Sequence, residues 1–181
     1  MGWRPPVASV PSPGRSAPEG LVVSAVEAIR TGSGLNVQYL SMNNAEPEYR
    51  KLSPVGFGHD GFRWHMRAYC HSRKSYRDFV LGRVLDWGPL PDLEPPAVED
   101  MEWIAMVSLT IVPNPALTPE HQKVIEIDYG MKDGGVTIVC RQALLFYTLK
   151  RLGLNTKTAG APEEHQIVLK NRDEIERYLN S

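Results

Sequence analysis

The stretch that decides the fold is Phe62–Arg83, which reads FRWHMRAYCHSRKSYRDFVLGR. In its first half apolar and polar side chains alternate: Phe62, Trp64, Met66 and Ala68 share one parity, and Arg63, His65, Arg67 and Tyr69 share the other. A period of two residues predicts a β-strand with one buried face and one exposed face. By this parity Trp64 belongs to the core, and the exposed face carries two arginines, an imidazole and a phenol.

A second run, Tyr76–Leu85, follows the polar connection His71–Ser75 and is also predicted to be a strand. Two adjacent antiparallel strands would bring Arg67, Arg77 and Arg83 close together. Guanidinium groups held on rigid strands suit a phosphate or another anion, because each presents a flat fork of donors. The alternative interpretation is the solvated face of a surface hairpin.

The charge distribution favours an anionic partner for this region. The chain has 181 residues and a net charge of −1, yet residues 50–83 hold eight Lys/Arg against two Asp/Glu, a local charge of +6. Such asymmetry is typical of a surface that meets an anion. Two cysteines, Cys70 and Cys140, are too few for a disulfide framework and indicate a reducing, cytoplasmic setting. Neither a membrane-spanning run nor a signal peptide is evident, so we expect no membrane partner.

Upstream of the central stretch, the sequence predicts a leader, a helix and two strands. Residues 1–19 are rich in Pro, Ser and Gly, which indicates a disordered leader. An apolar stripe at helical spacing predicts a helix from Pro18 to Arg30. Alternating patterns predict strands at Leu35–Met42 and Tyr49–Phe57, and the Asp60-Gly61 hairpin signal leads into the central strand.

Four prolines in acidic surroundings mark residues 88–100 as a linker between a first domain, residues 20–87, and a second domain, residues 101–181. In the second domain strands and helices alternate. The predicted strands are Trp103–Val112, Val136–Cys140 and His165–Leu169, and the predicted helices begin at Thr118 and span Ala143–Leu152 and Asp173–Leu179, the last one capped by Asn171. This pattern predicts a small α+β layer, ferredoxin-like, in a chain of the α+β class.

The sequence offers no arrangement for catalysis or for a cofactor. A strand places His65 and Cys70 on opposite faces, so these residues and His71 lack the spacing of metal ligands. Adjacent strand residues point apart, so Cys70 and His71 do not form a nucleophile–base pair. Gly56-Phe57-Gly58 lacks the lysine and the helix start of a phosphate-binding loop. We therefore expect no metal, no cofactor and no enzymatic activity.

The tract Arg63–Cys70, RWHMRAYC, followed by Tyr76–Arg83, YRDFVLGR, resembles the WYL domain. It is similar to the branch found in regulators of bacterial phage-defence operons of the BREX and CBASS kind. The Trp-Tyr-Leu that names the family reads here as Trp64-His65-Met66, a departure that fits this branch. The resemblance runs from Gly20 through a C-terminal extension, called WCX, to about Leu154. It implies a small SH3-like or Sm-like β-barrel and dimerisation through both regions.

The resemblance also implies a ligand pocket that receives a nucleotide or nucleic-acid signal and thereby alters DNA binding by a winged helix-turn-helix. Its lining residues would be Ser41, His65, Arg67, Tyr69, Arg77 and Arg83. The three arginines would neutralise phosphate, and Tyr69 and His65 would donate hydrogen bonds or stack a base. For Ser41 the alternative is an ordinary surface residue of its strand.

One departure from the family concerns DNA. Regulators of this kind carry the winged helix-turn-helix before the WYL domain, whereas only the leader and one helix precede it here, and neither resembles a recognition-helix pair. The expected function is ligand sensing by a homodimer, with specific DNA binding only if the helix-turn-helix is supplied elsewhere. Two alternatives stay open: a single-stranded RNA- or DNA-binding accessory that modulates an effector nuclease, and a purely structural dimerisation module.

Overall fold

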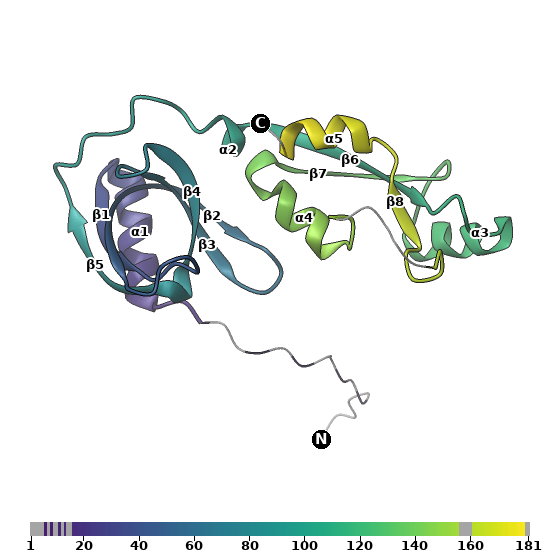
Figure 1. The fold of residues 1–181 in the computed structure, drawn as a ribbon, viewed down its shortest axis with the longest axis horizontal. Coiled ribbons are helices and arrows are strands. Elements are labelled where there is room, and N and C mark those ends of the chain that lie inside the picture. The colour runs from purple at the N-terminus through teal and green to yellow at the C-terminus, as the bar shows by residue number, and fades with distance from the viewer. Residues whose placement is uncertain are drawn as a thin grey trace, which may run out of the picture. The chain divides into compact units, whose positions relative to one another are not determined.

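The computed structural model describes residues 16–155 and 161–179, together with the single positions 6, 8, 11 and 13. The chain divides into two units, Met1–Ala97 and Val98–Ser181, and each is described by itself (Figure 1). Most of the predicted leader, residues 1–19, lies outside the described residues. No helix in the described parts of the chain is both long enough and apolar enough to cross a membrane.

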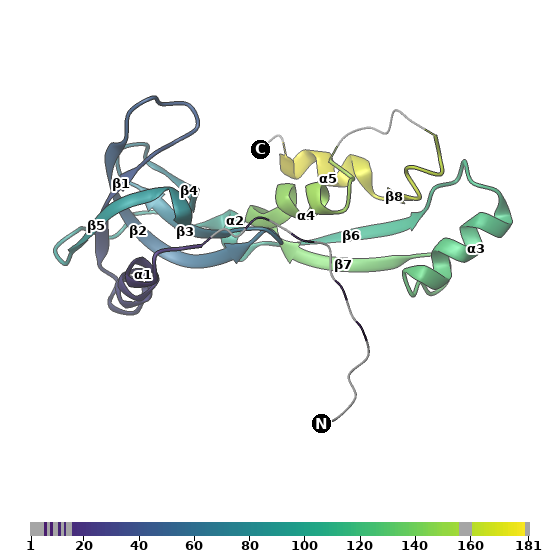
Figure 2. The ribbon, with the colours of Figure 1, turned by 90° about the horizontal axis from the view of Figure 1, so that it is seen from below.

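The N-terminal unit is one helix followed by a five-stranded antiparallel sheet. Its elements are α1 (Glu19–Thr31), β1 (Gly34–Tyr39), β2 (Glu48–His59), β3 (Trp64–Cys70), β4 (Ser75–Val80), the 3-10 turn η1 (Leu81–Arg83) and β5 (Val84–Leu90). The strand order is β4-β3-β2-β1-β5. Figure 1 shows the strands curling into a ring, and Figure 2 shows α1 on one side of it. The predicted helix and small, bent sheet are confirmed.

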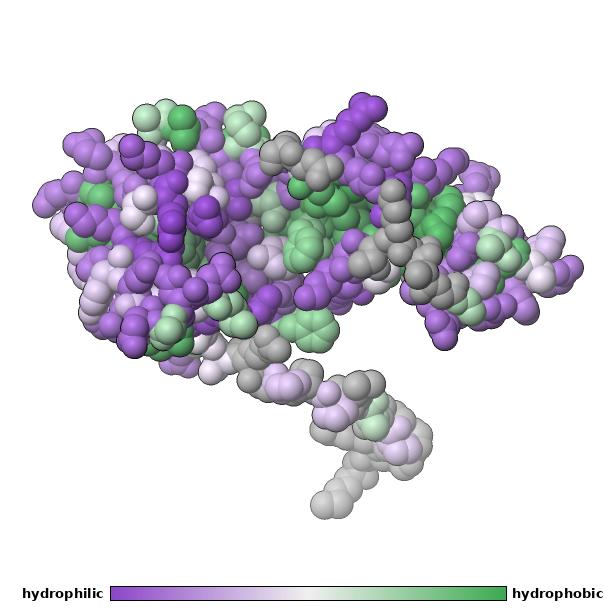
Figure 3. Space-filling model, viewed as in Figure 1, coloured by the Kyte–Doolittle hydropathy of each residue, from purple (hydrophilic) through white to green (hydrophobic). Residues whose placement is uncertain are grey.

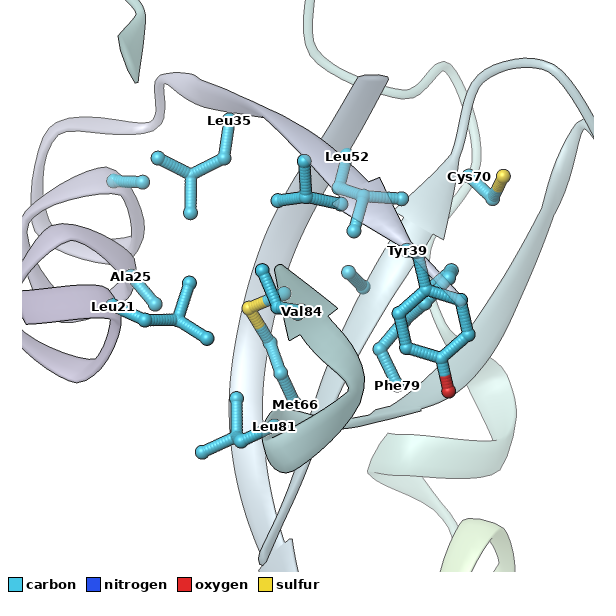
Figure 4. Packing of buried hydrophobic residues seen from close by; sticks show 13 residues of the cluster. Leu21, Ala25, Leu35, Tyr39, Leu52, Met66, Cys70, Phe79, Leu81 and Val84 are labelled. Atoms are coloured by element: carbon cyan, nitrogen blue, oxygen red, sulfur yellow. The ribbon is translucent and has the colours of Figure 1, made fainter. Parts of the chain in front are cut away.

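The core of this unit lies between α1 and the inner face of the curled sheet (Figure 4). Helical spacing places Leu21, Ala25 and Ala28 on the buried face of α1, and Gly32, at φ 67°, ends the helix in the left-handed conformation that glycine adopts freely. The strands contribute side chains from alternate positions, among them Leu52. A fully buried leucine of this kind stabilises the fold by about 1.5–3 kcal/mol.

The predicted continuous strand Tyr76–Leu85 is wrong. The chain leaves β4 at Val80, turns through η1 and enters β5 at Val84. The strand order explains the break, because β4 and β5 lie at opposite edges of the sheet and β5 pairs with β1. At the crossing, the Leu40 N–H donates to the Arg83 carbonyl at 3.1 Å. Arg77 and Arg83 therefore lie on different elements.

The C-terminal unit is a second, smaller α+β layer. Its elements are α2 (Met101–Ile104), β6 (Met106–Pro113), α3 (Pro119–Asp128), β7 (Val136–Arg141), the 3-10 turn η2 (Gln142–Leu144), α4 (Leu145–Arg151), β8 (Ile167–Leu169) and α5 (Arg172–Leu179). The sheet is antiparallel, with the three described strands in the order β7-β6-β8. The alternation of strands and helices is confirmed, and so is the α+β class.

Two local predictions in this unit differ from the structure. Trp103 lies in α2 rather than in a strand, because the Asp100 carboxylate accepts a hydrogen bond from the Trp103 N–H at 3.2 Å and caps this short helix. Asn171 stands at the start of α5, where its carbonyl accepts from the Ile175 N–H at 3.2 Å and its Nδ2 donates to Glu174 Oε2 at 3.1 Å. Its Oδ1, the atom expected to cap the helix, instead accepts from the Thr110 N–H of β6 at 3.0 Å, and its Nδ2 also donates to the Ser108 carbonyl at 3.0 Å. The Asp100 contact thus lies just before β6, and the Asn171 contacts tie the start of α5 to the middle of β6.

The sheet of the C-terminal unit has helices on one face. Val107, Leu109 and Ile111 of β6 are buried, and Figure 2 shows α4 and α5 on the same side of β6 and β7. Side chains of the opposite parity are exposed, including Met106 (58%) and Val139 (57%). Figure 3 shows a further gathering of hydrophobic side chains over α4. This unit therefore presents apolar surface to solvent, which is typical of an interaction surface.

Candidate ligand-binding site

The three predicted phosphate ligands do not converge. In the ladder between β3 and β4, Arg67 lies opposite Asp78 and Arg77 lies opposite Ala68. Residues directly opposite each other in an antiparallel pair share a face of the sheet, and neighbouring residues point to opposite faces. Arg67 and Arg77 therefore lie on different faces. The prediction that Arg67, Arg77 and Arg83 cluster is wrong, since it assumed the wrong register between the two strands.

The polar parity of β3 is not a solvated face. Arg67 is 4% exposed, and its Nη1 lies 3.4 Å from the Asp78 carboxylate. The half-buried Tyr69 packs edge-on against Tyr76 and His71, with 5.1 Å between ring centroids in each case. Buried charges are stable only when they are paired or hydrogen-bonded. Arg67 and Tyr69 thus belong to a packed polar layer.

Trp64, in contrast to Arg67, is exposed although it was expected to be buried. It was predicted to lie in the core by parity, but it is 48% exposed. The pair His59↔Trp64 is the last of the ladder between β2 and β3, so Trp64 stands at the end of the strand. The two rings stay in contact, with centroids 4.8 Å apart. Parity placed Trp64 on the correct face of the sheet, but it could not show that the residue lies at the exposed end of the strand.

A cavity of about 360 Å³ opens beside this end of β3. Its walls are two arginines, the exposed indole, the 3-10 turn and two residues that precede α1: Ser16, Ala17, Arg63, Trp64, Val80, Leu81, Gly82 and Arg83. Arg63 precedes β3, and Arg83 closes η1. Among the described residues, the Arg83 guanidinium has no hydrogen-bond or ion-pair partner. Two cations and an aromatic face therefore meet in one cavity.

A single carboxylate, that of Asp60, organises the rim of the cavity. Its Oδ2 accepts hydrogen bonds from Arg63 Nε and from His65 Nε2, both at 2.9 Å, and its Oδ1 accepts from the backbone N–H groups of Phe62 and Arg63, both at 2.8 Å. Burial of Asp60 by itself raises its pKa. The hydrogen bonds from His65, the two backbone groups and Arg63 outweigh burial and hold the pKa well below its ordinary value. Asp60 is therefore ionised at neutral pH.

Ser41 and His65 lie near the same end of the sheet. His65, 2% exposed, pairs with Val80, which lines the cavity. Ser41 follows Leu40, whose N–H donates to the Arg83 carbonyl. The Ser41 Oγ accepts from the Asn43 N–H at 3.3 Å. Arg77 is exposed and donates from Nε to Ser75 Oγ at 3.1 Å. Of the six predicted ligand residues, Arg83 is the one that lines the cavity.

Sequence reasoning missed three residues of this site: Asp60, Arg63 and Trp64. Arg63 was assigned to the polar parity but not selected, and Trp64 was assigned to the core. A signal was present, because a tryptophan next to an arginine at the start of a strand combines a stacking surface with a cation. Asp60 was read only as part of a hairpin turn. Its contacts depend on the geometry of that turn, which spacing alone does not give.

Comparison with known proteins agrees with this architecture. Residues 21–89 match the WYL domain, and residues 106–175 match the family described as the BrxR transcriptional regulator, C-terminal dimerization domain. Proteins named DNA-binding transcriptional repressor CapW are similar along the chain. The identities are 44% over 180 residues in Pseudomonas aeruginosa, 40% over 180 in Escherichia coli (strain KTE188) and 37% over 181 in Stenotrophomonas maltophilia.

Each of these alignments covers 99% of the chain and 60% of the relative, so the chain spans about three fifths of the length of these repressors. The N-terminal match includes α1 and all five strands of the first sheet, and the C-terminal match runs from β6 into α5. The chain is thus a WYL-domain protein whose C-terminal unit is a dimerization domain of the BrxR family.

Proposed function

We propose that this chain is the sensing and dimerising part of a bacterial transcriptional regulator of phage-defence genes. Its WYL domain binds a nucleotide or a short nucleic-acid signal. The observation that carries the proposal is the meeting of Arg63, Trp64 and Arg83 in one cavity. The names of the relatives, which describe DNA-binding repressors rather than enzymes, support the regulatory role.

The chemistry of the cavity suits a ligand with a phosphate and a base. Guanidinium groups bind phosphate oxygens through paired, charge-assisted hydrogen bonds. An exposed indole offers a stacking face, and base–aromatic stacking contributes about 1–3 kcal/mol per base. A volume of about 360 Å³ lies within the range of small-molecule pockets. In this proposal Arg63 and Arg83 hold the phosphate and Trp64 stacks the base.

The other predicted ligand residues take different places in the proposal. Ser41 and His65 lie near the cavity end of the sheet, and in this proposal the buried His65 supports the start of β3 rather than touching the ligand. Arg67 and Tyr69 support β3 from the packed layer described above. Arg77 is left out, because it lies on the other face of the sheet from Arg67 and does not line the cavity.

We place the action of the protein at DNA, in the cytoplasm, as a homodimer. The C-terminal match to a family of dimerization domains supports self-association. The prediction from the sequence stands that this chain alone does not select an operator, and that a helix-turn-helix supplied elsewhere would do so. Sequence-specific retardation that survives physiological salt and competitor DNA would contradict it.

The test of the ligand site is a thermal-shift screen of the chain with nucleotides and oligonucleotides, followed by titration calorimetry. We expect a saturable stabilisation by a phosphate-bearing ligand. Arg83→Ala and Arg63→Ala should each weaken binding by about 1–3 kcal/mol, because each removes charge-assisted hydrogen bonds. Arg77→Ala is the matched control and should bind as the wild type does. Wild-type affinity in both cavity variants would rule out this site.

A single-stranded RNA- or DNA-binding accessory is the second candidate. The observation that favours it is a set of exposed cations at the turn between β3 and β4 and on β2, namely Lys51, Arg73 and Lys74. None of their side chains has an ion-pair partner within the described part of the chain. Binding that depends on oligonucleotide length and falls steeply with salt would favour this candidate, whereas tight binding of a mononucleotide favours the sensor.

A further inference from the structure

Asp60 makes contacts that exceed the needs of a hairpin turn. Its side chain is 9% exposed and accepts four hydrogen bonds. Two come from the backbone of the turn and are typical of an aspartate at this position. The other two come from the side chains of Arg63 and His65, which share one parity of the sequence pattern and both bind Asp60 Oδ2. One carboxylate thus fixes two functional side chains.

The contact with Arg63 is one-sided. Asp60 Oδ2 binds the Nε of Arg63 at 2.9 Å. Within the described parts of the chain, the terminal Nη1 and Nη2 groups have no hydrogen-bond partner, and the side chain, 26% exposed, lines the cavity. The planar guanidinium is therefore held by one edge while its outer donors remain available to a ligand. Arg83, the other arginine that lines the cavity, has no such support among the described residues.

Holding Arg63 in this way lowers the entropic cost of binding. A free arginine loses much rotamer freedom when it binds an anion, whereas a planar fork that is already fixed loses little. The arrangement parallels metal sites, where an outer carboxylate orients the ligating side chain. The same carboxylate also binds His65, which pairs with the cavity residue Val80.

We propose that Asp60 is a positioning residue of the anion pocket, which holds Arg63 in the geometry that a phosphate-bearing ligand requires. This inference rests on the proposed function. The positioning role and simple electrostatics predict opposite effects of removing the Asp60 charge on phosphate binding. Asp60 is an anion beside an anion site, so electrostatics alone predicts tighter phosphate binding when its charge is removed. A positioning role predicts weaker binding.

The test is isothermal titration of the full chain with two probes, adenosine 5′-diphosphate and inorganic pyrophosphate. Asp60→Asn should weaken the binding of both probes by roughly tenfold, which is the effect of losing an outer carboxylate at metal sites. This weakening is expected even though the substitution raises the local charge by one unit. In an Arg63→Ala background, Asp60→Asn should have no further effect, because the two residues act through one contact. Asp78→Asn, which makes the same charge change beside Arg67, is the control and should leave both affinities unchanged.

A second variant leaves Asp60 intact, in case Asp60→Asn does not fold. Arg63→Lys keeps the charge but lacks the Nε–H that Asp60 holds, so it should weaken both probes nearly as much as Arg63→Ala. Binding by Asp60→Asn that equals or exceeds that of the wild type overturns the positioning role. So does full affinity in Arg63→Lys. Failure of the wild type to bind either probe, or full affinity in both Arg63→Ala and Arg83→Ala, overturns the pocket itself.

Discussion

The two units of this chain fill their interiors differently. The N-terminal unit buries Arg50, His65 and Arg67 beside its apolar core, whereas the buried ionisable residue among the described positions of the C-terminal unit is Asp100, a helix cap. Burying ionisable groups costs stability unless each is paired. The C-terminal unit bears this cost at Asp100 alone among its described residues. The comparison teaches that buried ionisable groups are concentrated in the N-terminal unit, whereas the interior of the C-terminal unit is mainly apolar.

The largest expected effect tests how far the C-terminal unit depends on apolar packing. Leu109→Ala, at a fully buried position of β6, should destabilise this unit by about 2–5 kcal/mol, because it removes buried methyl groups and leaves a cavity. Urea unfolding followed by tryptophan fluorescence measures the loss. Thr137→Ala, at an exposed position of β7, is the control and should change little. A loss below 1 kcal/mol for Leu109→Ala would mean that this sheet is not the core of the unit.

The second prediction concerns the uncovered face of the same sheet. Val139→Asp places a charge on the uncovered face of the sheet, where Val139 of β7 and Met106 of β6 are exposed, and it should raise the dimer dissociation constant by roughly a hundredfold if this face joins two copies. Light scattering over a concentration series measures the shift. Val124→Asp, on α3 and 53% exposed, is the matched control. An unchanged mass for Val139→Asp, with dissociation of Val124→Asp, would move the interface to α3.

The third prediction concerns the polar layer of the WYL domain. Asp78→Ala removes the carboxylate 3.4 Å from the buried guanidinium of Arg67, and it should destabilise the N-terminal unit by about 1–3 kcal/mol. Ligand affinity should stay near the wild-type value, since Asp78 does not line the cavity. Chemical denaturation and calorimetry on the same samples separate the two effects. A loss of affinity without a loss of stability would place the ligand on this layer instead.

The smallest effect is a difference in acid sensitivity. Burial and, secondarily, the charge of Lys51 lower the pKa of His71, and hydrogen bonds that outweigh burial lower that of Asp60. Both groups release protons more readily in the folded state, so the stability they contribute is complete above their unfolded pKa values. It is lost as pH falls, from about 6.5 downward for His71 and from about 4 downward for Asp60.

Because both groups belong to the N-terminal unit, this unit should lose stability between pH 7 and pH 3 before the C-terminal unit does. Hydrogen exchange resolved by mass spectrometry follows the two units in one experiment. In Asp60→Asn the loss below pH 4 should be smaller. Equal acid sensitivity of the two units would show that buried polar groups do not distinguish them.

Much of the fold was predictable because it depends on short periodicities. The helical stripe of α1 and the alternation of β3 each fixed an element, and glycine and proline marked the ends. What failed depended on long-range pairing. Alternation cannot show that β4 ends at Val80, because the reason is the pairing of β5 with β1 on the far side of the sheet.

The candidate site was less predictable for the same reason. Parity gives the face of a residue, but exposure also depends on its distance from the end of the ladder, and this distance separates Trp64 from Met66. The register between β3 and β4 separated Arg67 from Arg77. Arg83 lines the cavity, but not for the reason that the sequence suggested, since it reaches the cavity through η1 and not through a strand.

The strand order β4-β3-β2-β1-β5 has a consequence for folding kinetics. The first strand lies inside the sheet and the last pairs with it, Gly34 with Leu90, so the sheet closes through a contact of high sequence separation. Loop-closure entropy makes such contacts slow to form. We expect β5 to dock late, and η1, which carries Arg83, to settle only then. A ligand of the cavity would therefore recognise the completely formed sheet, and its binding would reduce the transient detachment of β5.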